Sequence, residues 1–342
     1  MKIPNSVLLV SCFAILLVAF GCSKSNDAVT PPDIYAFGLV NEALTTWKNG
    51  VPTYVTDRSI TVYPKAMAVV GTDVYVAGLS YDYGAISTAK YWKNGVGVAL
   101  TDGTKNAGAY GITVNGTDVY VVGYEGAGSY GNATPKYWKN GVAITLPVSS
   151  SSVASAATTL AVSGSDVHVV GWESTLDSVI AKYWKNGVAI RVTNNAKYGY
   201  SNYIKLDGNI IYIAGGEVNP GKNEAAKYWK NGTEFALTDG TWYANANMID
   251  VVDGNIYVAG FNNNAATSWK NGIATTLSET GKVGEALSVS VSRGDVYVAG
   301  TLKTPGTNAL VGSMLWKNGV PVAPFLGTDP TVQIGGAIVV TH

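Results

Sequence analysis

The amino-acid sequence predicts an all-β fold, namely a seven-bladed β-propeller built from four-stranded blades. Two observations predict it: the tetrapeptide Trp-Lys-Asn-Gly occurs seven times at intervals of 40 to 47 residues, and each repeat contains four short β-rich runs. A period of this length with four strands per repeat is typical of propeller blades. The tetrapeptides begin at Trp47, Trp92, Trp138, Trp184, Trp229, Trp269 and Trp316.

The composition bounds the classes of function. The chain has 342 residues, of which 13% are charged, and its formal net charge is zero; it also has 40 glycines and 21 tyrosines. Such a composition is typical of an all-β protein with many tight turns. Because the chain has no basic run, nucleic acid is not an expected partner, and anionic lipid surfaces have no electrostatic reason to bind it.

The first 22 residues differ in kind from the rest. An apolar run over 7–20 is too short to span a bilayer and is typical of a secretory signal peptide, which we place at 1–21. The sequence Ala-Phe-Gly-Cys at 19–22 resembles the lipobox of bacterial lipoproteins. This resemblance implies lipidation of Cys22, a tether over 22–32, and an exported protein anchored in the bacterial cell envelope, at the outer membrane. The alternative is an ordinary cleaved signal peptide with an incidental cysteine.

Each repeat contains four strands in the same order, as the third repeat illustrates. Strands are expected over 109–114, 118–123, 135–138 and 142–146, and the Asn-Gly of the tetrapeptide joins the third strand to the fourth. Both residues accept the positive φ of a type I′ turn, so this connection is predicted to be a tight hairpin. The lysine of the tetrapeptide is expected to be a solvated hairpin residue without a role.

Aromatic residues recur at fixed positions and are expected to fill the gaps between blades. One is the tryptophan of the tetrapeptide, and another is a tyrosine in the second strand. His168 replaces that tyrosine in the fourth repeat and is interpreted as a packing variant, not a ligand. The tyrosines are Tyr75, Tyr120, Tyr212, Tyr257 and Tyr297.

The two ends of the repeat array are complementary. Residues 33–38 form a second strand with no first strand before it, and residues 336–341 form a first strand with no second strand after it. One composite blade made from both ends would close the ring and remove the open edges. Over 33–342 the chain therefore resembles bacterial repeat-propeller lipoproteins. It lacks the Trp-Asp signature of WD repeats and the Asp box of sialidase-type propellers.

The connections between strands divide into two kinds. Those from the first to the second strand and from the third to the fourth are short and nearly invariant, and they lie on what we call the tight-turn face. The other connections vary and lie on the opposite, variable-loop face. Because loops on a rigid scaffold carry binding specificity, we expect function on the variable-loop face. The tether enters at the tight-turn face, so a lipidated chain would point the variable-loop face away from the membrane.

Aromatic residues and carboxylates gather in the variable connections of neighbouring repeats. Three successive repeats carry a Glu two residues after the glycine that ends the second strand. Aromatic rings stack on the apolar faces of sugars and carboxylates accept hydrogen bonds from their hydroxyls, which predicts a glycan site. The alternative is that the rings cap blade ends and the carboxylates are solvated. The candidate ligand-binding residues are Tyr124, Glu125, Trp172, Glu173, Tyr198, Tyr200, Glu217, Trp242 and Tyr243.

These residues favour a non-enzymatic, glycan-binding module of the cell envelope, monomeric and without cofactor or metal. The chain has two histidines, one of them C-terminal, so no Ser-His-Asp set or histidine metal triad can be drawn. One alternative is a protein–protein interaction scaffold on the cell envelope. The other is a glycoside-active enzyme, which needs only two carboxylates and could draw them from Glu125, Glu173 and Glu217.

Overall fold

The structure, a computed structural model, describes residues 31–81, 86–126, 132–193, 198–279, 281–306, 310–322, 332–334 and 339–341. The predicted signal peptide, Cys22 and the tether up to residue 30 lie outside these ranges. The described residues from Pro32 onward belong to one compact unit, Pro32–His342. Throughout the described ranges the regular structure is β-strand, and they contain no helix that is long and apolar enough to cross a membrane.

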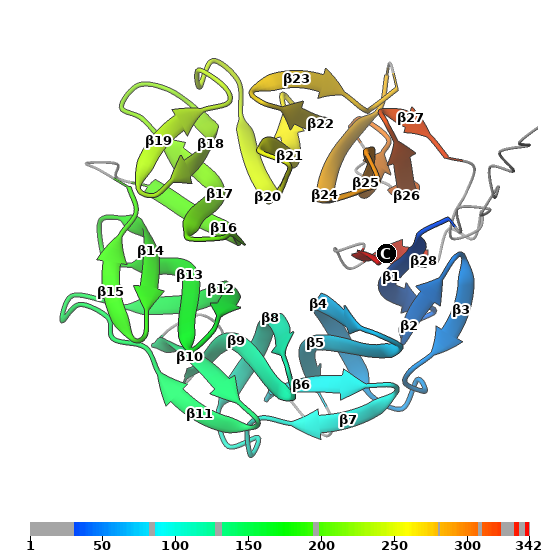
Figure 1. Cartoon of the computed structure of the whole chain (residues 1–342). Coiled ribbons are helices and arrows are strands. Elements are labelled where there is room, and N and C mark those ends of the chain that lie inside the picture. The colour runs from blue at the N-terminus through cyan, green and yellow to red at the C-terminus, as the bar shows by residue number, and fades with distance from the viewer. Residues whose placement is uncertain are drawn as a thin grey trace, which may run out of the picture. The chain divides into compact units, whose positions relative to one another are not determined.

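Four groups of four strands form separate antiparallel sheets, in which strands that follow one another in the chain are neighbours. In Figure 1 the first strand of each group lies toward the middle and the fourth lies at the outside. An all-β fold of four-stranded antiparallel repeats is thereby confirmed. The strands of these groups are β4 (Thr61–Val70), β5 (Asp73–Tyr81), β6 (Thr88–Lys93), β7 (Val96–Ala99); β8 (Asn106–Asn115), β9 (Asp118–Gly126), β10 (Ala133–Lys139), β11 (Val142–Thr145); β20 (Ala244–Val252), β21 (Asn255–Asn262), β22 (Ala265–Lys270), β23 (Ile273–Thr276); and β24 (Val283–Ser292), β25 (Asp295–Lys303), β26 (Leu310–Lys317), β27 (Val320–Pro321).

Two further groups, from the fourth and fifth repeats, are joined into one eight-stranded sheet. The junction is a single parallel pair between β14 and β16, at Val179 and Tyr198. This junction differs from the separate blades that the repeat predicts. Its strands are β12 (Ala154–Ser163), β13 (Asp166–Ser174), β14 (Val179–Lys185), β15 (Val188–Arg191), β16 (Tyr198–Asp207), β17 (Ile210–Val218), β18 (Glu224–Lys230) and β19 (Thr233–Ala236).

The first sheet takes strands from both ends of the unit. The strand β1 pairs on one edge with β2 and on the other with both β28 and β29. Asp33 lies opposite Thr341 in this pairing, so the two ends meet in register. The strand β29 also contacts β24 and β4, the first strands of the groups on either side. The strands are β1 (Asp33–Val40), β2 (Ala43–Lys48), β3 (Val51–Tyr54), β28 (Val332–Ile334) and β29 (Val339–Thr341).

The Trp-Lys-Asn-Gly turn has the geometry that its sequence predicts. Asn94 and Gly95 have φ angles of 48° and 87°, as a type I′ turn requires. The Asn94 side chain accepts a hydrogen bond from the Val74 backbone N–H at 2.8 Å and donates one to Asp73 Oδ1 at 2.7 Å. The tetrapeptide asparagine therefore joins the end of the third strand to the start of the second strand through side-chain hydrogen bonds.

The tetrapeptide lysine is solvent-exposed, as predicted, and it also forms an ion pair that was not predicted. Lys93 Nζ lies 2.9 Å from Asp73 Oδ2 and 5.2 Å from the centre of the Tyr75 ring. The interaction with Lys93 also holds the pKa of Asp73 below its ordinary value. The same ion pair recurs as Lys48–Asp33, Lys139–Asp118, Lys185–Asp166 and Lys317–Asp295.

Aromatic side chains fill the space between successive groups, as predicted. Trp138 is fully buried and packs in one cluster with Tyr75 of the preceding group. A third-strand tyrosine packs in the same kind of cluster in four repeats, as Tyr91, Tyr137, Tyr183 and Tyr228. The corresponding residues of the first and sixth groups are the smaller Thr46 and Ser268.

Bulges in three of the first strands link the fourth, fifth and sixth groups each to the group that follows. In β12, β16 and β20 the register with the second strand shifts by one residue. The residue at each bulge points its side chain to the neighbouring first strand, where it donates to a backbone carbonyl. The bonds are Thr158 to Ser201 O at 2.8 Å, Asn202 to Ala246 O at 2.9 Å and Asn247 to Ala286 O at 2.9 Å.

Candidate functional site

The three glutamates predicted to face a ligand are paired with lysines of their own sheets. Glu125 pairs with Lys136, and Lys182 Nζ lies 2.8 Å from Glu173 Oε2. Each lysine is in the third strand, diagonally across from the glutamate in the second, where long side chains meet. The carboxylates are thus neutralised inside the scaffold.

The Glu217 pair is the most deeply buried of the three. Lys227 Nζ donates to Glu217 Oε2 at 2.9 Å and to Glu234 Oε1 at 2.6 Å, and Glu217 is 2% exposed. Burial acts to lower the pKa of Lys227, but the two carboxylates outweigh it and the pKa lies above its ordinary value. This lysine remains charged beside its two carboxylate partners.

Glu173 is fully buried and receives two further hydrogen bonds. The Ser149 backbone N–H donates to Glu173 Oε1 at 3.2 Å, and the Ser149 hydroxyl donates to the same oxygen. Burial acts to raise the pKa of Glu173, but Lys182 and Ser149 outweigh it, so the pKa lies below its ordinary value. The carboxylate has structural partners and does not face solvent.

Two of the predicted aromatic residues belong to the packing between groups. Tyr124 is 6% exposed and lies in a cluster with Ala133 and Ala156, against which Trp172 is packed. The centres of the Tyr124 and Tyr110 rings are 5.4 Å apart. These rings fill the blade ends, which is the alternative that the sequence left open for them.

Four predicted aromatic residues remain accessible, around the fifth group. Tyr198 and Tyr200 begin β16, and Trp242 and Tyr243 immediately precede β20. Trp242 is 57% exposed, Tyr243 is 54% exposed and Tyr198 is 39% exposed, while Tyr200 is half-buried. Burial and the negative potential of Glu224 raise the pKa of Tyr200, so its ring lies near that carboxylate.

Glu224, at the start of β18, is the buried centre of this cluster. It is 3% exposed and accepts hydrogen bonds from the Tyr243 hydroxyl and from Asn245 Nδ2. Burial raises its pKa, and these two bonds offset only part of the rise. The hydrogen bond to Glu224 in turn raises the pKa of Tyr243 to about 12. A carboxylate with neutral partners thus anchors an exposed ring.

The polar network continues from Glu224 along the first strands. Asn202 Nδ2 donates to Asn245 Oδ1 at 2.6 Å, so two asparagines and a glutamate form a chain across β16, β20 and β18. Asn247 makes the equivalent bond to Glu285 Oε1, at 2.8 Å, one group further on. The variable-loop ends of these strands therefore present amide and carboxyl groups beside the accessible rings.

Glu224 and Asn245 were not predicted from the sequence, although the repeats contain a signal for Glu224. Three residues before the third-strand lysine, the third and fourth repeats have Ala133 and Val179, whereas the fifth has Glu224. The position filled by Tyr124 and Trp172 in those repeats is Gly216 in the fifth. A large side chain is thus exchanged for a buried carboxylate.

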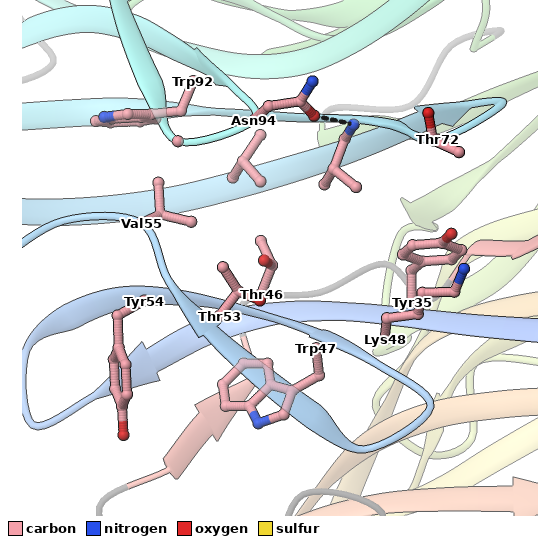
Figure 2. A pocket seen from close by; sticks show the side chains of 13 residues that line it. Tyr35, Thr46, Trp47, Lys48, Thr53, Tyr54, Val55, Thr72, Trp92 and Asn94 are labelled. Atoms are coloured by element: carbon pink, nitrogen blue, oxygen red, sulfur yellow. Dashed lines mark hydrogen bonds between the residues drawn. The ribbon is translucent and has the colours of Figure 1, made fainter.

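The larger cavities lie by the tight turns, away from these residues. One of about 340 Å³ separates the first sheet from the second and is lined by Thr46, Trp47, Tyr54, Trp92 and Asn94 among others. Figure 2 shows side chains of the two sheets facing one another across it, with the Asn94 hydrogen bond on one side. Similar cavities lie between the fourth and fifth groups and between the sixth and seventh.

Within the described ranges, no group of three or more His, Cys, Asp or Glu side chains is placed to hold a metal ion. His168, interpreted as a packing variant, is buried, and its Nδ1 lies 2.7 Å from the Tyr183 hydroxyl. Burial lowers its pKa, so the imidazole is neutral at pH 7. It joins the second strand to the third within its group.

No protein-family model matches the chain, and no curated protein matches it. Solved structures are similar in fold. Prolyl oligopeptidase B from Galerina marginata superposes with a TM-score of 0.50 at 12% identity, over 90% of this chain and 49% of the peptidase. A neuraminidase-like protein from A/bat/Guatemala/164/2009 has a TM-score of 0.49 at 9% identity, over 77% of this chain and 90% of that one.

At this level of identity the likeness to the peptidase shows the fold alone, and that fold is of the β-propeller type. The chain spans about half the length of the peptidases it resembles. Several of the similar structures are enzymes, including peptidases and a β-fructofuranosidase.

Proposed function

We propose that the seven groups of strands form one seven-bladed β-propeller, closed through the first sheet. Its support is the pairing of β1 with β28 and β29 and the contact of β29 with both neighbouring first strands. Closure would leave no open sheet edge in the ring, which explains why both ends of the chain contribute to one sheet. Deletion of residues 332–342 is then expected to lower the melting temperature sharply.

On this scaffold we propose a non-enzymatic binding module that recognises glycans through its variable-loop face. The observation that carries the proposal is the pair Trp242 and Tyr243, both more than half exposed, with the Tyr243 hydroxyl held by the buried Glu224. An exposed ring in a fixed orientation is suited to stack on the apolar face of a pyranose. Tyr198, Tyr200 and the amide of Asn245 supply hydroxyl and amide groups for sugar hydroxyls.

The paired glutamates no longer favour the glycoside-active alternative. A glycosidase needs two carboxylates that face the scissile bond. Glu173 and Glu217 are buried and each is engaged by a lysine, so neither is presented to a sugar. A protein partner on the same platform is the second candidate, because exposed tryptophan and tyrosine side chains such as Trp242 and Tyr243 also anchor protein interfaces.

A glycan array tests the proposal. The purified protein is screened beside Trp242→Ala and, as a matched control, Tyr54→Ala, which removes a similarly exposed ring from β3 in the first group. Binding that Trp242→Ala abolishes and Tyr54→Ala retains is the expected result. Equal binding by all three proteins would contradict the proposed position, and no binding by the folded wild type would favour a protein partner, sought by pull-down from the cell envelope.

We also propose that the chain is exported and anchored through a lipid on Cys22, acting as a monomer. The proposal is supported by the apolar run at 7–20 and by Ala-Phe-Gly-Cys at 19–22. Replacing Cys22 by Ser is expected to abolish incorporation of a labelled fatty acid and to move the protein from the membrane fraction to the soluble one. Retention of label in Cys22→Ser would contradict lipidation at this residue.

A further inference from the structure

The bulge in the first strand of the second group carries a residue unlike those of the fourth, fifth and sixth groups. In those groups the bulge residues are Thr158, Asn202 and Asn247, whose short side chains donate to a backbone carbonyl of the next group. In β4 the register with β5 shifts at Lys65, which holds the same position. A long cation thus replaces a short polar residue on β4, which lies toward the middle in Figure 1.

Lys65 has no carboxylate partner among the described residues. Its Nζ lies 6.0 Å from the centre of the Tyr110 ring, on the first strand of the third group. An aromatic ring attracts an ammonium but does not neutralise its charge. Lys205, the other lysine of the described first strands, is paired with Asp250 at 2.8 Å. The described scaffold therefore leaves the charge of Lys65 unbalanced.

The ammonium of Lys65 is accessible to water but partly enclosed by protein. The side chain is exposed, yet the surrounding protein removes part of its hydration and lowers its pKa. Because the ordinary pKa of a lysine lies far above 7, the side chain is still a cation at pH 7. Partial desolvation of a cation is unfavourable, and an anion bound beside it would offset this cost.

An exposed aromatic ring lies close to Lys65 on the same strand. Tyr63, two residues earlier, is 46% exposed, and its ring packs edge-on against Tyr81 with the ring centres 6.0 Å apart. This contact fixes the orientation of the Tyr63 ring. Two residues of a strand span about 7 Å, so the ring and the ammonium are close enough for one sugar unit to touch both.

Tyr63 and Lys65 both face the third group. Leu79 lies opposite Tyr63 in the β4–β5 register, so their side chains share a face of the sheet. On that face Leu79 reaches β8, because a Cβ on Gly108 would lie 3.2 Å from Leu79 Cδ2. Lys65 reaches the Tyr110 ring of the same strand. The ring and the cation therefore belong to one surface, between the second and third groups.

We propose that this surface binds an acidic sugar, a uronic acid unit of a glycan, with its carboxylate paired to Lys65 and its apolar face stacked on Tyr63. The inference rests on the proposed glycan-binding function and names the class of glycan. A uronic acid carries its carboxylate on the sugar ring itself, so one unit offers both the apolar face and the charge. The site is separate from the platform of Trp242 and Tyr243.

Calorimetric titration with trigalacturonate and with its methyl ester tests the proposal, because the two probes share a sugar skeleton and differ in charge. Wild type is expected to bind trigalacturonate at least about tenfold more tightly, the usual effect of a charge-assisted hydrogen bond. Lys65→Gln is expected to remove this preference, and Lys65→Arg to retain it. The matched control Lys303→Gln removes an exposed lysine at the end of β25 and is expected to change neither affinity.

A further variant tests the stacking contact, and the outcomes separate this inference from the proposed function. Tyr63→Ala is expected to weaken both probes, since stacking does not depend on the charge. A preference for trigalacturonate that persists in Lys65→Gln would overturn the inference, as would a folded wild type that binds trigalacturonate no better than the ester, or binds neither. In each case glycan binding that Trp242→Ala abolishes would leave the proposed function standing, whereas failure of every glycan on the array would overturn both.

Discussion

The carboxylate of Glu224 occupies the space that a side chain on Gly216 would need, because a Cβ there would overlap Glu224 Oε1 and crowd Asn245 Nδ2. Gly216 and Glu224 lie on adjacent strands. The lack of a side chain at Gly216 leaves the space that the Glu224 carboxylate fills. Without a side chain at 216, the fifth group can bury a carboxylate where the third and fourth groups bury aromatic rings. This exchange creates the polar centre beneath Tyr243.

Gly216→Ala is accordingly expected to displace Glu224 and to lower the free energy of unfolding by about 1 to 3 kcal/mol, the usual cost of overpacking. Urea unfolding measures the loss. Gly312→Ala is the control, since a Cβ at Gly312 meets no atom within 4 Å and its φ is not positive. Equal stability of Gly216→Ala and Gly312→Ala would show that Glu224 is not confined as described.

Glu224 also gives the protein a pH-dependent stability. Its pKa is raised in the folded state by burial, so the folded protein binds this proton more tightly than the unfolded chain. The stability that protonated Glu224 contributes is therefore present in full below the ordinary pKa of a glutamate. It is lost as the pH rises through the raised pKa of Glu224 in the folded protein. Glu224→Gln, which is neutral at every pH, is expected to melt higher than wild type at pH 8.

The melting temperatures of wild type and Glu224→Gln, measured from pH 4 to 8, provide the check. The advantage of the variant should shrink toward pH 4, where Glu224 is protonated in the folded wild type. A constant difference across this range would mean that Glu224 does not titrate differently in the two states. A variant that is less stable at pH 8 would mean that the ionised carboxylate is favoured by its hydrogen bonds.

Glu217→Gln is expected to have the opposite effect, although Glu217 is buried to the same degree. The carboxylate is paired with Lys227, and its removal leaves that lysine with only Glu234 as a charged partner. Breaking a buried pair costs about 3 kcal/mol, whereas replacing both members by apolar residues can be neutral. Urea unfolding of Glu217→Gln beside Glu217→Leu/Lys227→Met measures this, and a double variant no more stable than the single one would contradict the pairing argument.

Most of the fold could be predicted from the repetition in the sequence. The hairpin at Asn94-Gly95 and its counterparts in the other six repeats could be predicted, because the tolerance of positive φ is a local property of asparagine and glycine. The role of Lys93 could not be read in the same way, since it depends on the register that brings Asp73 within reach. The parallel pair between Val179 and Tyr198 involves two variable connections, where the repeat gives no guidance.

The candidate site was harder to predict because burial is a tertiary property. Glu173 and Glu217 lie at the ends of second strands, in positions that would face a ligand if they were solvated. Their partners, Lys182 and Lys227, each lie two residues before the tetrapeptide tryptophan, so the register of the second and third strands would have revealed the pairs. Glu224 could not be placed from its own sequence, since its burial depends on the absent side chain of Gly216 on the neighbouring strand.

A last prediction concerns the cavity between the first and second sheets. In four repeats a third-strand tyrosine packs into the gap between groups, whereas the first group has Thr46, which lines a cavity of about 340 Å³. Thr46→Tyr restores the repeated residue at a half-buried position with space beside it. It is expected to raise the free energy of unfolding by about 1 kcal/mol, as cavity-filling changes commonly do.

Urea unfolding of Thr46→Tyr is compared with two further variants. Thr233→Tyr adds the same ring at an exposed position on β19 and is expected to change little, and Tyr91→Thr makes the reverse exchange and is expected to destabilise. Because a tyrosine on a β-strand is favourable in itself, only a gain larger than that of Thr233→Tyr counts as filling the cavity. Equal gains at the two positions would mean that the ring introduced at position 46 stays in solvent and the gap between the first two sheets remains open.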